Sequence, residues 1–195
     1  MSASTTPIEP LRAAQDALQQ HWGFDAFRPG QADLIAAVLA GKDALGVLPT
    51  GGGKSVCYQV PAVVLGGLTL VVSPLIALMQ DQVAALRRRG IPAAALTSAL
   101  PFREAEQVWT DAEFGRDRLR YVAPEQLQTE RFRLRAPRLP VRLVAVDEAH
   151  CISEWGHDFR PAYREIATVR ALVGPVPMLA VTATATPEVR RDILS

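Results

Sequence analysis

The segment Leu48–Ser55 (Leu-Pro-Thr-Gly-Gly-Gly-Lys-Ser) has residue types and spacing suited to binding a phosphate chain. Its three consecutive glycines let backbone N–H groups point toward one centre without Cβ clashes. Lys54 can reach β- and γ-phosphates, and the Ser55 hydroxyl can ligate Mg²⁺. The general pattern has glycine where Leu48 stands, but the segment follows a predicted strand and opens a predicted helix, whose dipole favours anions. The predicted nucleotide-phosphate loop comprises Thr50, Gly51, Gly52, Gly53, Lys54 and Ser55.

Two adjacent acids, Asp147 and Glu148, end the apolar run Val144–Val146. A buried strand would deliver both carboxylates to its carboxyl end. Adjacent acids often cap a helix, but the phosphate loop upstream favours a catalytic role. Asp147 can hold the Mg²⁺ shared with Ser55, and Glu148 can orient or deprotonate the water that attacks the γ-phosphate.

A third segment, residues 24–31, precedes the phosphate loop by about 20 residues. The Gln31 amide can donate to and accept from an adenine edge. Phe24 can stack on the base, with Arg28 in support. A helix N-terminus with core aromatics is the alternative for this segment taken alone.

A fourth segment, residues 151–161, follows directly on the acids and concentrates Trp155, His157, Phe159 and Arg160 within six residues. This composition is typical of a surface on which bases stack. Aromatics packed into the core are the alternative, and His157 is as well explained by a structural role. Arg160 can add a phosphate contact.

The elements that must position these segments alternate along the chain. Short, nearly continuous apolar runs alternate with helical patterns, which predicts a parallel α/β sheet sandwiched by helices, with ligands at the carboxyl ends of the strands. The predicted strands are Ala44–Leu48, Leu68–Ser73, Ala93–Leu96, Leu119–Val122, Leu143–Val146 and Met178–Thr182. The predicted helices are Pro29–Ala40, Lys54–Leu65, Ile76–Arg89, Phe102–Asp111 and Pro161–Leu172. Residues 1–10 are expected to form a flexible lead-in, and Arg131–Pro140 a basic loop.

Composition limits the remaining classes of protein. The chain has 195 residues, 49% of them hydrophobic, and a net charge of +1, which excludes a mainly disordered tail. No apolar run is long enough for a transmembrane helix, and residues 1–10 lack the apolar core of a signal peptide. Two cysteines, Cys57 and Cys151, cannot make a four-cysteine zinc site, so no zinc is expected and both are interpreted as small buried residues in a reducing cytosol.

The small net charge conceals an excess of arginine. Lys42 and Lys54 are the two lysines among 21 basic residues, and residues 116–142 hold eight arginines against three acids. Arginine suits phosphate recognition. A solvated surface explains this excess equally simply, so the excess does not by itself identify a nucleic-acid binder.

Together these segments resemble the first RecA-like motor domain of the RecQ branch of superfamily 2 DNA helicases. Residues 27–31 resemble that family's adenine-recognition motif, and 49–55 its phosphate loop, with Leu48 included. Residues 147–150 and the loop through Arg160 resemble its Walker B motif and aromatic-rich loop. Segments 72–82, 122–125 and 181–185 resemble its strand-contacting motifs and the motif that couples hydrolysis to movement. The resemblance covers about residues 15–195, and it implies DNA-contacting or coupling roles for Ser73, Pro74, Pro124, Trp155, His157, Phe159, Arg160, Thr182 and Thr184.

The resemblance implies a P-loop ATP hydrolase of RecA-like fold over residues 11–195. It would use ATP and Mg²⁺, move 3′ to 5′ along single-stranded DNA, and separate forked or duplex DNA in repair and recombination. It would be cytoplasmic, associated with the nucleoid in a bacterium, and without membrane contact. Phe24 replaces a tyrosine common in relatives, so a hydroxyl contact is lost while stacking is kept.

In this family ATP lies between two RecA-like domains, and the second supplies an arginine to the site. The second RecA-like, zinc-binding and winged-helix domains are expected to be absent from these 195 residues, so slow turnover is expected. Three alternatives remain: an RNA helicase of the same superfamily, a non-catalytic ATP- or DNA-binding module, and a small-molecule P-loop kinase. The aromatic segment argues against the first, Lys54 and Glu148 against the second, and the lack of a recognisable lid against the third.

Overall fold

The computed structural model describes residues 8–156 and 158–195. Within them, six strands form one parallel sheet in the order β1-β6-β5-β2-β4-β3. These strands are β1 (Ala44–Val47), β2 (Leu68–Val72), β3 (Ala93–Leu96), β4 (Leu119–Val122), β5 (Val141–Val146) and β6 (Met178–Thr182). The predicted α/β class and parallel sheet are confirmed, and each of the six predicted strands is present within two residues at either end.

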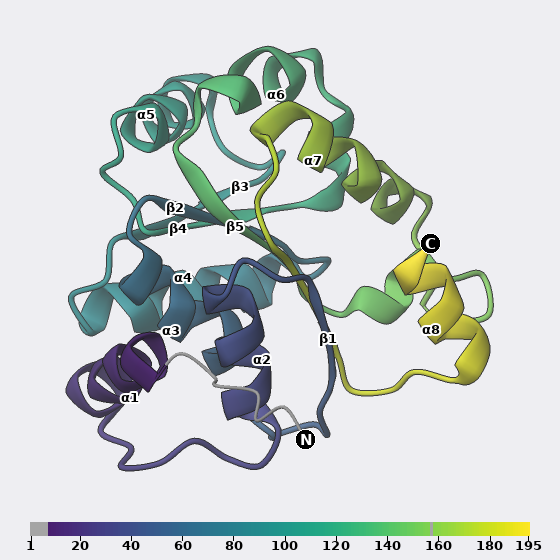
Figure 1. Cartoon of the computed structure of the whole chain (residues 1–195). Helices are drawn as coiled ribbons and strands as arrows, with labels where there is room; N and C mark the ends of the chain where they lie inside the picture. The colour runs from purple at the N-terminus through teal and green to yellow at the C-terminus, as the bar shows by residue number, and fades with distance from the viewer. Residues whose placement is uncertain (1–7, 157) are drawn as a thin grey trace.

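Helices cover both faces of this sheet (Figure 1). Helices α3 (Val56–Leu65) and α4 (Ile76–Arg88) pack on one face, and α2 (Gln31–Leu39) lies beside α3. Helices α5 (Phe102–Glu113), α6 (Glu130–Arg135) and α7 (Ile166–Val173) cover the other face. Helix α8 (Pro187–Leu194) lies to one side, against the short 3₁₀ turn Ala149–Ile152.

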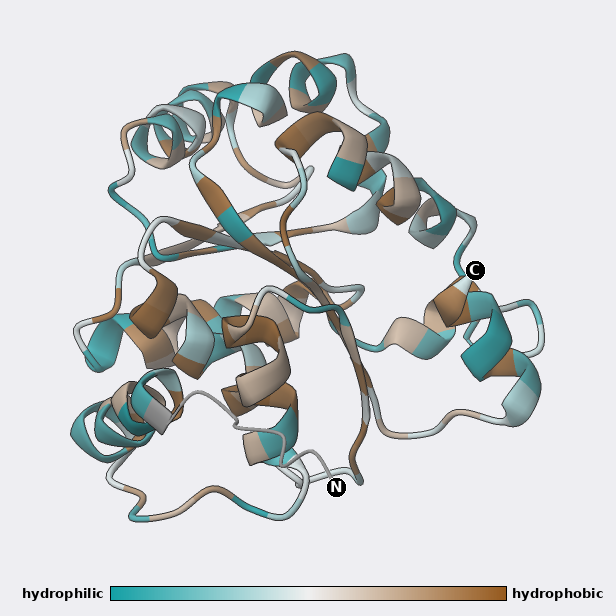
Figure 2. Cartoon of the chain, viewed as in Figure 1, coloured by the Kyte–Doolittle hydropathy of each residue, from teal (hydrophilic) through white to brown (hydrophobic). Residues whose placement is uncertain are grey.

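Burial explains why the strands are mainly apolar, with Thr69 and Arg120 as buried polar members of β2 and β4. All five residues of β2 and all four of β4 are buried, because helices cover both faces. Figure 2 shows the hydrophobic residues concentrated in the strands and in α2 and α3, whereas α1, α5 and α8 are largely hydrophilic. Among the described residues, no helix is both long and apolar enough to cross a bilayer.

The prediction of a basic loop at residues 131–140 was wrong, and the flexible lead-in expected at residues 1–10 was wrong for residues 8–10. Helix α1 (Ile8–Trp22) begins inside the expected lead-in, and the rest of that lead-in, residues 1–7, lies outside the described residues. Ala14 and Leu18 of α1 pack against Ile35 and Val60, so a second layer of helix covers α2 and α3. The expected basic loop at residues 131–140 contains α6, because Thr129 accepts the Phe132 N–H and Phe132 is buried in the core. A further helix, α8, was not predicted.

The strand order brings the predicted site segments to one edge of the sheet. β1 pairs with β6, β6 with β5, and β5 with β2, all in parallel. The carboxyl ends of these four strands therefore lie side by side. They carry the phosphate loop, Thr182, the two acids and Ser73 respectively.

Candidate nucleotide-binding site and the adjoining aromatic loop

A cavity of about 500 Å³ opens at this edge and collects most of the residues predicted to bind nucleotide. Its lining residues are Phe24, Ala26, Arg28, Gln31, Gly51, Gly53, Lys54, Ser55, Val56, Leu78, Gln82, Asp147 and Glu148. They come from the segment before α2, the phosphate loop, α3, α4 and the end of β5. Thr50, by contrast, is exposed and does not line the cavity.

Glycine is required in the phosphate loop for two separate reasons. Gly51 and Gly53 have φ values of 77° and 76°, in the left-handed region that other residues avoid. Gly52 has no such φ, but a Cβ there would lie 2.7 Å from the carbonyl oxygen of Pro49. A Cβ at Gly53 would lie 2.5 Å from Nε2 of Gln31, so loop and amide are in close contact.

Gln31 is 3% exposed, and its amide is bonded to the phosphate loop. Its Nε2 donates to the carbonyl oxygens of Gly52 (3.1 Å) and Gly53 (3.0 Å), and its Oε1 accepts the Arg28 N–H (2.9 Å). Arg28 in turn donates to the Gly51 carbonyl oxygen. The sequence predicted that Gln31 would bind adenine, but it did not predict this bracing of the loop. Phe24 is half exposed at the rim of the cavity.

Asp147 is a buried carboxylate with few donors around it. It is 6% exposed, and one oxygen accepts the backbone N–H of Glu148 (3.0 Å). Burial, and secondarily the Glu148 carboxylate, raise the pKa of Asp147 to about 6. Asp147 and Ser55 line the same cavity. A divalent cation there would stabilise the ionised form of the buried Asp147 carboxylate, whose pKa is raised, so these residues fit Mg²⁺.

Glu148 adopts an unusual, left-handed backbone conformation. Its φ is 48° and its ψ 48°, and it is the one described non-glycine residue with positive φ. Its carboxylate lies 3.6 Å from the Lys54 ammonium and 3.4 Å from Nδ1 of His150. Strain of this kind is concentrated at functional sites, because the surrounding contacts must hold it.

His150 continues this chain of contacts to β6. Its Nδ1 lies 2.9 Å from Oγ1 of Thr182, which donates to the carbonyl oxygen of Thr184 (3.0 Å). Polar contacts therefore run from Lys54 through Glu148 to the end of β6. His150 was not among the residues predicted for the site, although its position two residues after Glu148 was an available signal.

In the aromatic loop, residues 153–161, the Trp155 side chain is 77% exposed. Trp155 N–H donates to the Ser153 hydroxyl (3.2 Å), which bonds to Asp192 on α8. Phe159 is half-buried under the Arg164 guanidinium, at 5.2 Å. His157, a predicted DNA-contacting residue, lies outside the described residues.

Arg160 connects the aromatic loop to the segment after β2. Its Nη1 donates to the carbonyl oxygen of Pro74 (3.2 Å), and its Nε lies 3.7 Å from the Asp158 carboxylate. One donor of the half-buried guanidinium is therefore bonded to the protein, and its Nε faces a carboxylate.

The remaining predicted DNA-contacting residues differ in exposure. Four have buried side chains: Ser73, Pro74, Pro124 and Thr182. Thr184, in contrast, is exposed. The two cysteines are buried, which raises the pKa of each thiol to about 12. No group of three or more His, Cys, Asp and Glu suited to a metal occurs in the described part of the chain.

Comparison with known proteins agrees with this geometry. The family model described as DEAD/DEAH box helicase matches residues 28–193. The chain is 45% identical over 181 residues to the probable ATP-dependent DNA helicase RecS of Bacillus subtilis, covering 93% of the chain and 36% of that protein. It is 47% identical over 186 residues to ATP-dependent DNA helicase RecQ of Pasteurella multocida, covering 95% of the chain and 29% of that protein. The chain thus spans about a third of the length of these relatives.

Solved structures show the same fold at lower identity. The helicase Lhr of Mycobacterium smegmatis, described as bound to ssDNA and AMP-PNP, superposes with a TM-score of 0.71 at 22% identity, over 94% of this chain and 26% of that one. A hypothetical ATP-dependent RNA helicase from Sulfolobus tokodaii gives 0.68 at 20% identity, over 96% of this chain and 54% of that one. The fold is therefore RecA-like, and the sequence match over residues 28–193 shows that the chain belongs to the DEAD/DEAH box helicase family.

Proposed function

We propose that this chain is the ATP-binding half of a RecQ-type, ATP-dependent 3′–5′ DNA helicase acting in DNA repair and recombination. The observation that carries the proposal is the single cavity where the phosphate loop, Gln31 and the two acids meet. The likeness to the RecQ and RecS helicases supports DNA as the nucleic acid. Residues from α1 onward would form the first RecA-like domain, facing a second one.

ATP would enter this cavity along the phosphate loop. Lys54 and the loop N–H groups would bind the β- and γ-phosphates, and Phe24 would stack on the adenine. Gln31 would exchange at least one of its bonds to the loop carbonyls for the adenine edge. Nucleotide recognition would therefore be linked to a change in the phosphate loop itself.

For hydrolysis, Asp147 and Ser55 would hold Mg²⁺, which neutralises charge on the phosphates. Glu148 would orient and deprotonate the attacking water. The Lys54 ammonium, now 3.6 Å from Glu148, would move to the phosphates and release that carboxylate for this role.

DNA would act on this site through the aromatic loop. Exposed Trp155 offers a face on which a base can stack, and Arg160 links the loop to the Pro74 carbonyl oxygen. His150, Thr182 and Thr184 would transmit the state of Glu148 to the end of β6.

Calorimetry on the 195-residue chain tests the nucleotide site. ATP and ADP should bind, Lys54→Ala should abolish binding, and Lys42→Ala, which removes the other lysine of the chain, should leave it unchanged. Equal affinity for GTP and ATP would contradict the role given to Gln31 and Phe24.

The rate of ATP hydrolysis tests whether the 195-residue chain holds only part of the catalytic site. The described cations lining the cavity are Arg28 and Lys54. A second domain is expected to add the transition-state arginine, a group worth roughly 10³–10⁵ in rate in other phosphoryl-transfer systems. The 195-residue chain should therefore hydrolyse ATP very slowly and unwind no duplex. Efficient unwinding would refute the proposal, and stronger stimulation of hydrolysis by RNA than by DNA would favour an RNA helicase.

A further inference from the structure

Basic side chains gather at the edge of the sheet opposite the nucleotide cavity. This edge is formed by the loops that lead into the amino-terminal ends of the strands. Five arginines at or just before these strand ends define what we term the basic row: Arg87 and Arg88 in the last turn of α4, Arg89 directly after it, Arg118 before β4, and Arg142 at the start of β5. Three of them lie outside the arginine-rich stretch 116–142, so the sequence does not show the whole group as contiguous.

Strand pairing places these arginines side by side. The Arg118 N–H donates to the carbonyl oxygen of Pro92, in the loop before β3, and its own carbonyl accepts the Thr69 N–H of β2 (both 2.8 Å). Arg142 crosses the start of β2, because a Cβ on Gly67 would lie 2.7 Å from its Cγ. The basic row thus extends over β5, β2, β4 and β3, about 14 Å at a strand spacing of about 4.8 Å.

The acids of this edge are already paired with other arginines. Asp111 pairs with Arg116 (2.8 Å) and Asp117 with Arg120. Glu113 pairs with Arg135 (2.8 Å), and Asp43 with Arg170 (2.7 Å). In contrast, no residue of the basic row makes an ion pair with any described residue. Four of its five side chains are exposed and Arg118 is half-buried, so the row presents uncompensated positive charge to solvent.

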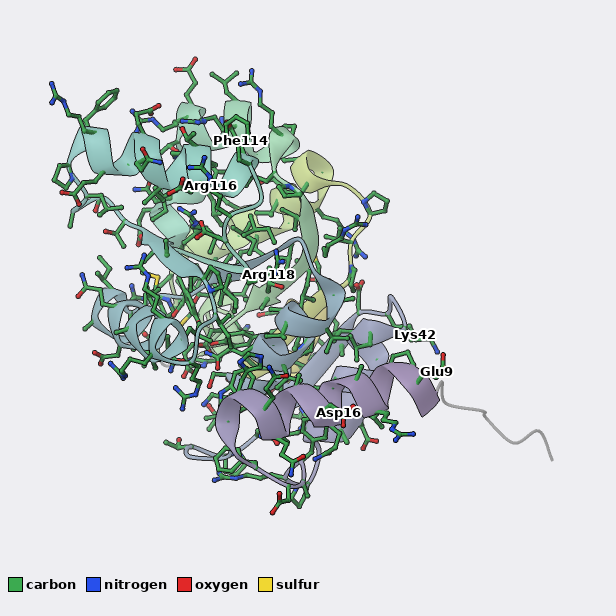
Figure 3. The ribbon with its side chains drawn as sticks, turned by 90° about the vertical axis from the view of Figure 1, so that its left-hand side faces the viewer. Glu9, Asp16, Lys42, Phe114, Arg116 and Arg118 are labelled. Atoms are coloured by element: carbon green, nitrogen blue, oxygen red, sulfur yellow. The ribbon has the colours of Figure 1, made fainter. Side chains whose placement is uncertain are left out.

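The surroundings of the row indicate what it can bind. Figure 3 shows Arg118 on the same side of the molecule as Phe114, Arg116 and Lys42, with Glu9 and Asp16 of α1 lower on that side. These two acids limit the positive surface in one direction. Phe114 is exposed, but the Arg116 guanidinium lies 5.8 Å from its ring centroid, so this side offers no series of free aromatic faces for unstacked bases.

We propose that the basic row binds the phosphate backbone of duplex DNA, at a site separate from the nucleotide cavity and the aromatic loop. Guanidinium groups match phosphate oxygens bidentately. Duplex DNA presents one negative charge about every 1.7 Å, twice the density of one strand, so a row about 14 Å long can meet several phosphates at once. A duplex held there would lie at the amino-terminal ends of the strands, whereas ATP would lie at their carboxyl-terminal ends.

The test uses the 195-residue chain, without nucleotide, and a blunt 20-base-pair duplex of mixed sequence. Fluorescence anisotropy should show binding that weakens steeply with salt. Arg118→Gln combined with Arg142→Gln should weaken binding about tenfold or more at low salt. It should also lower the slope of log affinity against log salt by about 2, because each lost phosphate contact removes roughly 0.9.

A matched control replaces two exposed arginines elsewhere, Arg103→Gln with Arg190→Gln, and should leave affinity and slope unchanged. Circular dichroism should show both double variants folded. Wild-type duplex affinity in the Arg118/Arg142 variant would overturn the proposal. So would competition by polyglutamate as effective as duplex at equal charge, which would assign the row to an acidic protein. Loss of single-strand but not duplex binding would also overturn it.

Duplex binding by the basic row should be independent of nucleotide binding in the cavity. The Arg118/Arg142 variant should bind ATP with wild-type affinity, and Lys54→Ala should bind duplex normally in the absence of nucleotide. Failure of the proposed ATP site would therefore appear in calorimetry alone, and failure of the basic row in anisotropy alone.

Discussion

At the scale of single residues, Asp147 and Glu148 differ although they are adjacent. Asp147 is buried and accepts the Glu148 backbone N–H, whereas Glu148 has a left-handed backbone conformation and its carboxylate lies near Lys54 and His150. The two carboxylates still repel one another, since the Glu148 carboxylate contributes to the raised pKa of Asp147. In the proposed mechanism Asp147 would hold a cation and Glu148 would handle a proton.

Replacement of Asp147 by Asn should stabilise the nucleotide-free chain above pH 6. The pKa of Asp147 is about 6 in the folded state against 3.8 ordinarily, so ionisation at higher pH opposes folding, by about 1–3 kcal/mol. The gain in unfolding free energy from Asp147→Asn should be full above about pH 6 and vanish as the pH falls toward 4. Urea titrations at pH 4 and pH 8 measure it; an equal gain at both would contradict the burial argument. The same variant should lose Mg²⁺-dependent ATP binding.

At the scale of elements, the phosphate loop depends on α2 as well as on its own glycines. Gln31 at the start of α2 bonds to the Gly52 and Gly53 carbonyl oxygens, and Arg28 bonds to that of Gly51. The loop between β1 and α3 is thus held by a segment about 20 residues earlier in the chain. Movement of α2 and of the phosphate loop should therefore be coupled.

Gly53→Ala and Gly51→Ala form a matched pair that tests this coupling. Their φ values, 76° and 77°, are equal within a degree, so both substitutions should cost about 1–2 kcal/mol in backbone strain. A Cβ at Gly53 would also strike the Gln31 amide at 2.5 Å, whereas at Gly51 it would meet nothing within 4 Å. Thermal denaturation and ATP calorimetry should therefore show the larger loss for Gly53→Ala. Equal losses would mean that Gln31 does not brace the loop.

At the scale of the whole molecule, the aromatic loop lies beside the nucleotide site without lining its cavity. Tyr163, after the loop, donates to the Asp147 carbonyl oxygen (2.9 Å), and Arg160 bonds to Pro74 at the end of β2. Trp155 is exposed, while Arg160 ties its loop to the end of β2 and Tyr163 contacts the end of β5. The effect of the aromatic loop on DNA affinity and its effect on DNA-stimulated ATP hydrolysis should therefore be separable by mutation.

Trp155→Ala should weaken single-stranded DNA binding by about five- to 150-fold, because stacking contributes about 1–3 kcal/mol per base. It should leave ATP affinity unchanged. Phe102→Ala removes another exposed aromatic, on α5, and should have no effect on single-strand affinity. Anisotropy with an oligonucleotide measures both. Unchanged binding by Trp155→Ala would assign the loop to packing.

Arg160→Ala should act differently, because Arg160 joins the loop to the Pro74 carbonyl oxygen, whereas the Trp155 ring is exposed. Single-strand affinity should fall less than in Trp155→Ala, while the ratio of ATP hydrolysis with and without DNA should approach one. A normal ratio in Arg160→Ala would break the proposed link between the loop and the acids.

The sequence by itself determined the strands and the chemistry-bearing segments, since both are encoded locally. Buried parallel strands require continuous apolar runs, and a phosphate loop requires consecutive glycines before a helix. For that reason the class of fold, and many of the residues that line the proposed nucleotide cavity, could be predicted from short stretches such as residues 48–55, whereas Ala26, Leu78 and Gln82 could not. Helix α1 and helix α6 could not be predicted in the same way. They depend on burial against α2 and α3, and on Phe132 packing and Arg135 pairing with Glu113.

Only the tertiary structure decided which distant groups meet. Gln31 bonds to a loop 21 residues away, His150 to Thr182 over 32 residues, and Arg160 to Pro74 over 86. The same holds for the basic row, because the sheet order brings arginines near the starts of three different strands to one edge. Parallel pairing aligns strand ends irrespective of their separation in sequence. Local pattern therefore supplied the functional groups, and the sheet order set their partners.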